Sequence, residues 1–154
     1  MKIEARIKEL GLELPAVAAP TANYLNWRIT GNLLYVSGQV PRGADGVLRV
    51  GKLGAGLTAE EGYQHSRLSA LGILACAKEA LGDLDRVEKV VKLLGMVNSA
   101  PDFGDQPKVI NGCSDLLVEV FGKEIGSHAR SAVGLAALPG GTSVEIEVIM
   151  QVKT

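Results

Sequence analysis

The longest helical pattern in the chain runs from Thr58 to Leu81. Its apolar residues recur at helical spacing, which puts them on one face of a helix. They are Leu68, Leu71, Ala75 and Ala80, with Ile73 and Leu74 widening the apolar face. Thr58 and Glu61 have the spacing of a capping box, and Gly82 is a typical stop residue. The pattern therefore predicts a helix that begins after Thr58 and ends before Gly82.

Two further helices and five strands are predicted along the rest of the chain. The helices are residues 2–10, with Ile3, Ile7 and Leu10 on one face, and Phe103–Phe121, with Pro107 near its first turn. The strands are rich in β-branched or small apolar residues and are bounded by turn residues. They are Leu25–Ile29, Leu33–Val40, Val87–Val97, Ser131–Leu138 and Val144–Val152. A short edge strand is also predicted near Val47–Val50, after a turn at Asp45-Gly46.

The last two strands are predicted to form a hairpin, because only the short turn cluster Pro139–Thr142 joins the end of one to the start of the other. Two ionisable residues stand where buried strands usually avoid them. Arg130 lies at the entrance of the first strand and Glu145 near the start of the second. The starts of two hairpin strands do not face each other. If both residues belong to one site, packing or a neighbouring subunit must bring them together.

The order of these elements predicts an α+β fold with one β-sheet covered on one face by two helices, because each amphipathic helix needs a sheet face to cover. One domain spanning 1–154 is expected, with the helix at about 2–10 appended to it. The strands Leu33–Val36 and Val144–Ile149 carry apolar residues on both faces. A single copy would expose the second face of the sheet, which predicts an oligomer.

The composition of the chain argues against several classes of function. The formal net charge is −1 and the chain has only six aromatic residues (one Trp, three Tyr, two Phe), so nucleic-acid binding is not expected. The two cysteines, Cys76 and Cys113, lack metal-ligand spacing and are predicted to be buried and reduced. No signal peptide or membrane-spanning stretch is recognisable. We therefore expect a cytoplasmic protein that does not contact membranes.

Several catalytic arrangements lack support in the sequence. There is no G-x-S-x-G motif, no cluster of metal ligands and no phosphate-binding loop, so neither a metal site nor a phosphate site is expected. Only two histidines occur. His65 lies within the first long helix and is interpreted as a solvated or partly buried residue. His128, two positions before Arg130, is interpreted as a loop residue rather than a base.

Arg130 and Glu145 remain as candidates for chemistry. An arginine keeps its charge and offers a planar fork that matches a carboxylate, so Arg130 could anchor a small organic acid. Glu145 could orient a water or transfer a proton if its surroundings raise its pKa. The alternative is that the two residues form a structural ion pair with each other. Spacing alone leaves both interpretations open.

A family resemblance is visible in several motifs taken together. They are Gly31-Asn32, Tyr35–Pro41 (YVSGQVP), Ala129-Arg130-Ser131, Leu138-Pro139 and Val144–Glu147 (VEIE). In this order and spacing the chain resembles the Rid (reactive intermediate deaminase) family, also called YjgF-type or L-PSP endoribonuclease-like proteins, over roughly residues 20–152. The resemblance implies a chorismate-mutase-like fold and a homotrimer with a barrel-like core and ligand clefts between subunits.

The resemblance also implies an activity and a set of site residues. Active Rid proteins hydrolyse enamine and imine intermediates such as 2-aminoacrylate and 2-iminobutanoate to 2-keto acids and ammonia, without a cofactor. Arg130 matches the arginine that holds the substrate carboxylate, and Glu145 the glutamate that positions the attacking water. Tyr24, Gly38 and Asn111 match cleft residues.

The chain departs from the usual Rid pattern at two positions and in the loop region Leu48–Leu57, which is longer than usual. Ala132 stands where deaminase members often have cysteine, so only its backbone could serve the substrate. Ser114 stands where an aromatic residue is common. These departures predict a divergent subgroup. They also keep open a non-catalytic protein that binds a small keto or amino acid, and, with less support, an endoribonuclease.

Overall fold

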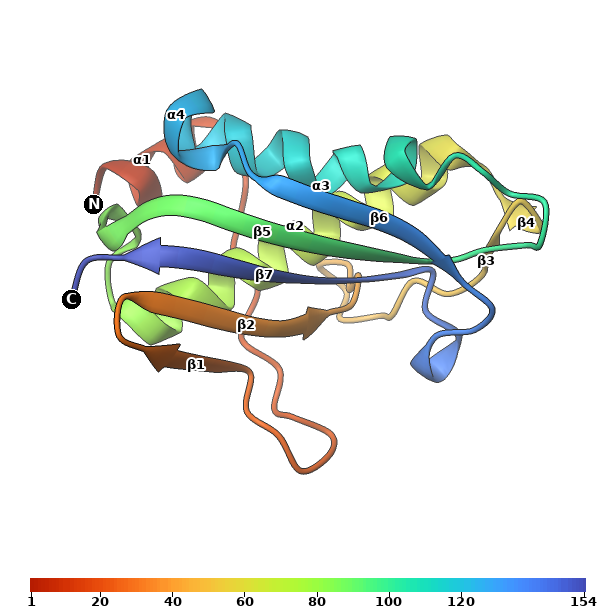
Figure 1. Cartoon of the computed structure of the whole chain (residues 1–154), viewed down its shortest axis with the longest axis horizontal. Helices are drawn as coiled ribbons and strands as arrows, with labels where there is room; N and C mark the ends of the chain where they lie inside the picture. The colour runs from red at the N-terminus through yellow and green to blue at the C-terminus, as the bar shows by residue number, and fades with distance from the viewer.

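The computed structural model describes all residues from Met1 to Thr154 and is built around a five-stranded sheet (Figure 1). Its strands follow the spatial order β1-β2-β7-β5-β6. They are β1 (Trp27–Thr30), β2 (Leu33–Gln39), β5 (Val87–Asn98), β6 (Ala129–Leu135) and β7 (Val144–Val152). Only β5 and β6 run parallel, while the other neighbouring pairs are antiparallel. The predicted α+β class with one mixed sheet is confirmed.

Two long helices cover one face of this sheet (Figure 1). The helix α2 (Ala59–Leu81) packs against β2 and β7, and α3 (Gln106–Phe121) packs against α2, β5 and β6. Two shorter helices, α1 (Lys2–Glu9) and α4 (Lys123–Gly126), flank them at one end. The second long helix starts three residues later than predicted, with Pro107 in its first turn. No helix is both long and apolar enough to span a bilayer.

The capping box predicted at the start of α2 is present. The backbone N–H of Glu61 donates to Thr58 Oγ1 over 3.2 Å, and the backbone N–H of Thr58 donates to Glu61 Oε2 over 2.8 Å. These two bonds satisfy amide groups that have no partner within the helix. Gly82 ends the helix with φ +75°, a conformation that glycine adopts without steric cost.

The segment between β2 and α2 differs from its prediction. The expected edge strand near Val47–Val50 does not form, and only isolated bridges occur there, Arg42 with Leu48 and Val50 with Thr142. The short strands β3 (Lys52–Leu53) and β4 (Gly56–Leu57) follow instead. Short 3₁₀ turns lie at Leu84–Arg86 and Pro139–Gly141. The glycine-rich composition favours turns here over a continuous strand.

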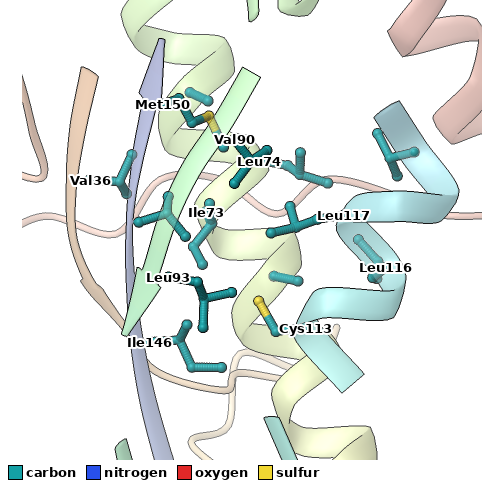
Figure 2. Packing of buried hydrophobic residues seen from close by; sticks show 14 of the residues in the cluster. Val36, Ile73, Leu74, Val90, Leu93, Cys113, Leu116, Leu117, Ile146 and Met150 are labelled. Atoms are coloured by element: carbon teal, nitrogen blue, oxygen red, sulfur yellow. The ribbon is translucent and has the colours of Figure 1, made fainter. Parts of the chain in front are cut away.

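The hydrophobic core lies between the sheet and the two long helices, where 27 buried residues form one cluster. Figure 2 shows Ile73 and Leu74 of α2 and Leu117 of α3 pointing toward the strands. Cys76 and Cys113 both belong to this cluster, and neither forms a disulfide. Burial raises the pKa of the Cys76 thiol to about 11, so both cysteines act as small apolar residues, as predicted.

The predicted C-terminal hairpin is wrong. The strands β6 and β7 do not pair with each other, because β5 lies between them and pairs with both. Arg130 lies beside Leu93 of β5, and Glu145 lies beside Met96 on the other edge of that strand. The Pro139–Gly141 turn is therefore part of a connection that passes the end of β5 rather than a tight hairpin loop.

The other face of the sheet has no helix over it. The residues of β7 that point there alternate with core residues, and they are Glu145, Glu147, Ile149 and Gln151. Tyr35 of β2 and Val133 of β6, 42% and 41% exposed, lie on the same face. We call this surface the open face. This face is mixed, because Tyr35, Val133 and Ile149 are apolar whereas Glu145, Glu147 and Gln151 are polar, so the predicted apolar second face is present only in part.

Candidate functional site

Arg130, the second residue of β6, points to the helix-covered face of the sheet. Its neighbour across the ladder is Leu93, which is fully buried in the core, and adjacent residues of paired strands share a face. The side chain reaches the edge of α3, where its Nη1 donates to Asn111 Oδ1 over 2.7 Å and to Ser114 Oγ over 3.2 Å. The structure therefore brings Arg130 and the predicted cleft residue Asn111 together.

The hydrogen bonds of Arg130 leave one edge of its guanidinium group available. Both N–H groups of Nη1 are used, and Nη2 has one long contact of 3.5 Å to the carbonyl oxygen of Pro107. The Nε–H has no acceptor in the chain. Nε and Nη2 form one edge of the planar guanidinium group, with N–H bonds that point the same way, and can bind two oxygens of one carboxylate. The arrangement can thus hold an organic anion.

Ala132 lies two residues further along β6 and on the same face as Arg130. It pairs with Gly95 and packs partly against the core. A side chain at Gly95 would collide with Ile110 of α3, so this glycine allows helix and strand to approach closely. Arg130, Asn111 and Ala132 thus form one group at the β6–α3 edge, which we call the arginine cluster.

Glu145 lies on the open face, half-buried, beside Gly38 of β2. A Cβ atom at Gly38 would lie 2.8 Å from both Cγ and Cδ of Glu145, so only glycine leaves room for this carboxylate. Burial raises the pKa of Glu145 above its ordinary value, and the nearby Glu147 raises it further. Neither a cation nor a hydrogen-bond donor offsets that burial. Such an unpartnered, partly buried carboxylate is typical of a functional group.

Tyr24 lies in the irregular segment before β1 and is 46% exposed. The next residue, Leu25, accepts a hydrogen bond of 2.6 Å from Ser37 Oγ, and Asn26 accepts one of 2.9 Å from the Ser37 backbone N–H. Ser37 directly precedes Gly38. This segment is therefore fastened to the part of β2 that contacts Glu145. We call Tyr24, Gly38 and Glu145 the glutamate cluster.

The two clusters do not meet within one chain. The arginine cluster lies on the helix-covered face at the β6 edge, whereas Glu145 lies on the open face between β2 and β5. Arg130 and Glu145 form no ion pair, and the nearest polar partners of Arg130 are neutral. The alternative interpretation of a structural ion pair between these two residues is therefore wrong for the single chain.

His128 is a loop residue, as predicted, but its ring is held by hydrogen bonds. It lies between α4 and β6, and its ring bridges Gly126 O at 2.7 Å from Nδ1 and Ser114 Oγ at 2.9 Å from Nε2. Burial lowers its pKa, and the positive charge of Arg130 lowers it further. The sequence could have indicated that the His128 ring lies near Arg130. The two residues are two positions apart, and residues two apart on an extended segment share a face.

The surroundings of His65 indicate a role in the fold rather than in catalysis. Its Nδ1 lies 2.8 Å from the hydroxyl of Ser143, which is fully buried, and burial lowers its pKa. No carboxylate orients the ring, and a substrate cannot reach Ser143. The acidic residues Glu4, Asp83 and Asp85 also gather at the end of the molecule near α1, where the amino group of Met1 contacts them. Neither group adds to the candidate site.

One mixed sheet with two helices on a single face, and polar groups at its edge, defines a small α+β protein of the chorismate-mutase-like class. Residues 4–146 match the family described as "YjgF/chorismate_mutase-like, putative endoribonuclease". The chain belongs to this family, and the predicted relation to Rid proteins is confirmed.

Relatives and solved structures cover nearly the whole chain. "Protein TCP17" of Trypanosoma cruzi is 47% identical over 97% of this chain and 94% of that protein. The protein Atu1372 from Agrobacterium tumefaciens, titled as having unknown function, is 46% identical with a TM-score of 0.89, over 98% of this chain and 94% of that one. A "putative endoribonuclease" from Shewanella oneidensis is 36% identical with a TM-score of 0.93, over 97% and 99%.

Similarity to a protein titled RidA is lower. RidA from the Antarctic bacterium Psychrobacter is 26% identical, with a TM-score of 0.59 over 89% of this chain and 94% of that one. "Putative regulator AldR" of Lactococcus lactis is 31% identical over 93% of this chain and 95% of that protein. The Agrobacterium and Shewanella structures have higher TM-scores with this chain than RidA has, which agrees with a subgroup that has diverged from RidA.

Proposed function

We propose that this protein hydrolyses small enamine and imine acids, of the 2-aminoacrylate or 2-iminobutanoate type, to 2-keto acids and ammonia. The observation that carries the proposal is the Nε–Nη2 edge of Arg130, which makes only one long contact of 3.5 Å, from Nη2 to the carbonyl oxygen of Pro107, while Nη1 is held by neutral acceptors of α3. Such an arginine is fixed in direction yet keeps its charge for a ligand. A substrate carboxylate is the anion that fits a planar fork.

Glu145 supplies the second group that the reaction needs. Water attacks C2 of the protonated imine, which an enamine forms by taking up a proton at C3, and one water proton passes to the carboxylate of Glu145. The nitrogen of the resulting carbinolamine takes that proton from Glu145, and the C–N bond breaks to release ammonia while the hydroxyl group returns its proton to Glu145 and becomes the carbonyl of the 2-keto acid. A raised pKa suits this exchange, because a base works best when its pKa is near the working pH. The imine is already electrophilic, so positioning supplies much of the catalysis.

The two clusters must come from different copies of the chain to act on one substrate. Their placement on opposite faces of the sheet prevents one chain from completing the site, whereas a ring of copies can set the open face of one against the β6 edge of the next. We propose a homotrimer, as the family resemblance implies, with three such clefts. Tyr24 and Gly38 then come from the copy that supplies Glu145, and Asn111 and Ala132 from the copy that supplies Arg130.

A non-catalytic binding protein for a small keto or amino acid is the second candidate. It is favoured by Ala132, which removes any thiol from the cleft, and by the Lactococcus lactis relative that is named "Putative regulator AldR". An endoribonuclease, a word that appears in the family description, has weaker support. The net charge is −1 and no stacked aromatic surface marks a path for RNA.

The test is ammonia release from enzymatically generated 2-iminobutanoate, for wild type, Arg130→Ala and the exposed control Arg42→Ala. We expect the wild type to exceed buffer, Arg42→Ala to match it, and Arg130→Ala to lose about 100-fold or more, because two charge-assisted hydrogen bonds are removed. Circular dichroism checks that the variant folds.

Two results would contradict this proposal in different ways. If wild-type protein releases no ammonia above buffer but 2-oxobutanoate still raises its melting temperature, the binding protein is supported instead. If Arg130→Ala unfolds or dissociates while Arg42→Ala does not, Arg130 has a structural role.

A further inference from the structure

Arg130 belongs to a chain of hydrogen bonds that leads away from the cleft. Ser114 Oγ lies 3.2 Å from Arg130 Nη1 and 2.9 Å from His128 Nε2. His128 Nδ1 in turn lies 2.7 Å from the carbonyl oxygen of Gly126, at the end of α4. This chain of hydrogen bonds thus connects the guanidinium group of Arg130, at the start of β6, to α3 through Ser114 and then to the end of α4 through His128.

The direction of each bond follows from the carbonyl of Gly126, which can only accept. His128 Nδ1 must therefore carry the proton, and in a neutral ring Nε2 is then an acceptor. Half-burial and the nearby Arg130 cation lower the pKa of His128 and keep the ring neutral. The hydroxyl of Ser114 consequently donates to Nε2 and presents its lone pair to Arg130 Nη1.

We propose that Ser114 and His128 are positioning residues that set the plane of the Arg130 guanidinium. With Asn111 as its only acceptor, Nη1 would be held by one bond, and the planar group could swing about it. A second acceptor fixes both N–H directions of Nη1 and therefore aims the Nε–Nη2 edge. This inference rests on the proposed function, because it requires that edge to bind the substrate carboxylate.

His128 is unsuited to act as the base in place of Glu145. Both of its ring nitrogens are engaged, one with a backbone carbonyl and one with Ser114. Its effect on a ligand must therefore pass through Ser114 and Arg130.

The experiment compares the binding of pyruvate with that of its uncharged amide, pyruvamide, by NMR titration. The ratio of the two affinities reports how well the guanidinium meets a carboxylate, whereas a general loss of stability changes both affinities together. We expect the ratio to fall about tenfold in Ser114→Ala and in His128→Phe, because one hydrogen bond to a charged group is lost. Ser114→Thr and His128→Gln retain the hydroxyl and the acceptor, and should restore the ratio to within about twofold.

The outcomes separate this inference from the function on which it rests. If wild type prefers pyruvate but Ser114→Ala and His128→Phe keep the full preference, the positioning role is wrong and the carboxylate site stands. If wild type itself fails to prefer pyruvate over pyruvamide, both proposals are overturned. If one of the two loss variants fails to fold by circular dichroism, the other decides.

Discussion

Arginine residues in this protein show two different environments. Arg67 of α2 makes a bidentate pair with Glu119 of α3, at 3.2 and 3.0 Å, so its charge is neutralised within the fold. Arg130 is held only by neutral oxygens and keeps its charge uncompensated. Among the carboxylates, Glu145 resembles Arg130 in having no partner of opposite charge, although it is half-buried. Sequence patterns identified Arg130 and Glu145 as chemical candidates, but the faces on which they lie depend on strand pairing.

Replacing Glu145 with Gln should make the protein more stable at neutral pH and less active. The folded-state pKa of Glu145 is raised, so its ionised form costs stability above that pKa, and the cost disappears as the pH falls toward 4.5. We therefore expect a higher melting temperature for Glu145→Gln at about pH 7.5 and a difference that shrinks toward about pH 4.5. Thermal unfolding at matched protein concentration measures this.

The exposed Glu124→Gln serves as the control for that experiment, and it should show neither effect. A lower melting temperature for Glu145→Gln at neutral pH would mean that the carboxylate has a stabilising partner, for example a donor from another copy. Loss of ammonia release together with a gain in stability would be the signature of a group kept for function.

At the level of elements, local signals predicted the helices well and strand pairing poorly. The helix α2 has its cap, apolar face and stop residue within its own sequence, so its ends could be placed closely. The partner of a strand depends on distant segments, and neighbouring strands in sequence pair only about two times in three. The Pro139–Gly141 turn resembled a hairpin loop, yet β5 offers both of its edges and separates β6 from β7.

Close contact between α2 and α3 depends on Gly112. A Cβ atom there would lie 2.0 Å from the carbonyl oxygen of Tyr63, so Gly112→Ala must push the two helices apart. We expect a loss of about 2–3 kcal/mol in the free energy of unfolding, measured by urea denaturation, although alanine favours helices more than glycine. The displacement would also move Asn111 and Ser114, so ligand affinity should fall with stability.

Gly72→Ala in α2 is the matched control for this helix contact. Its nearest neighbour atoms belong to the flexible side chain of Gln39, which can move aside. This variant should be neutral or more stable by up to about 1 kcal/mol. Equal effects of Gly72→Ala and Gly112→Ala would contradict a special role for the α2–α3 approach.

At the scale of the whole molecule, the open face is the feature that a single copy leaves unexplained. A hollow of about 380 Å³ lies on it, lined by residues of β2, β5 and β7 that include Tyr35, Leu94 and Ile149. Apolar surface of this kind on a sheet is typical of an interface. Glu145 lies on the same face, two residues before Glu147 of the lining, and would then meet another copy, which is the arrangement that the proposed site needs. Assembly and catalysis are therefore expected to fail together when this face is altered.

Leu94→Glu tests this coupling, because Leu94 lies on the open face between Glu147 of β7 and Ser131 of β6. If copies associate through this face, three buried carboxylates would be introduced per trimer and the assembly should dissociate, since burying unpaired charge is costly. Light scattering after size-exclusion chromatography measures the mass, and ammonia release should disappear with the larger species. Gln64→Glu, on the exposed surface of α2, adds the same charge and should leave both unchanged. A Leu94→Glu protein that keeps its mass and its activity would place the interface, and hence the completion of the site, elsewhere on the molecule.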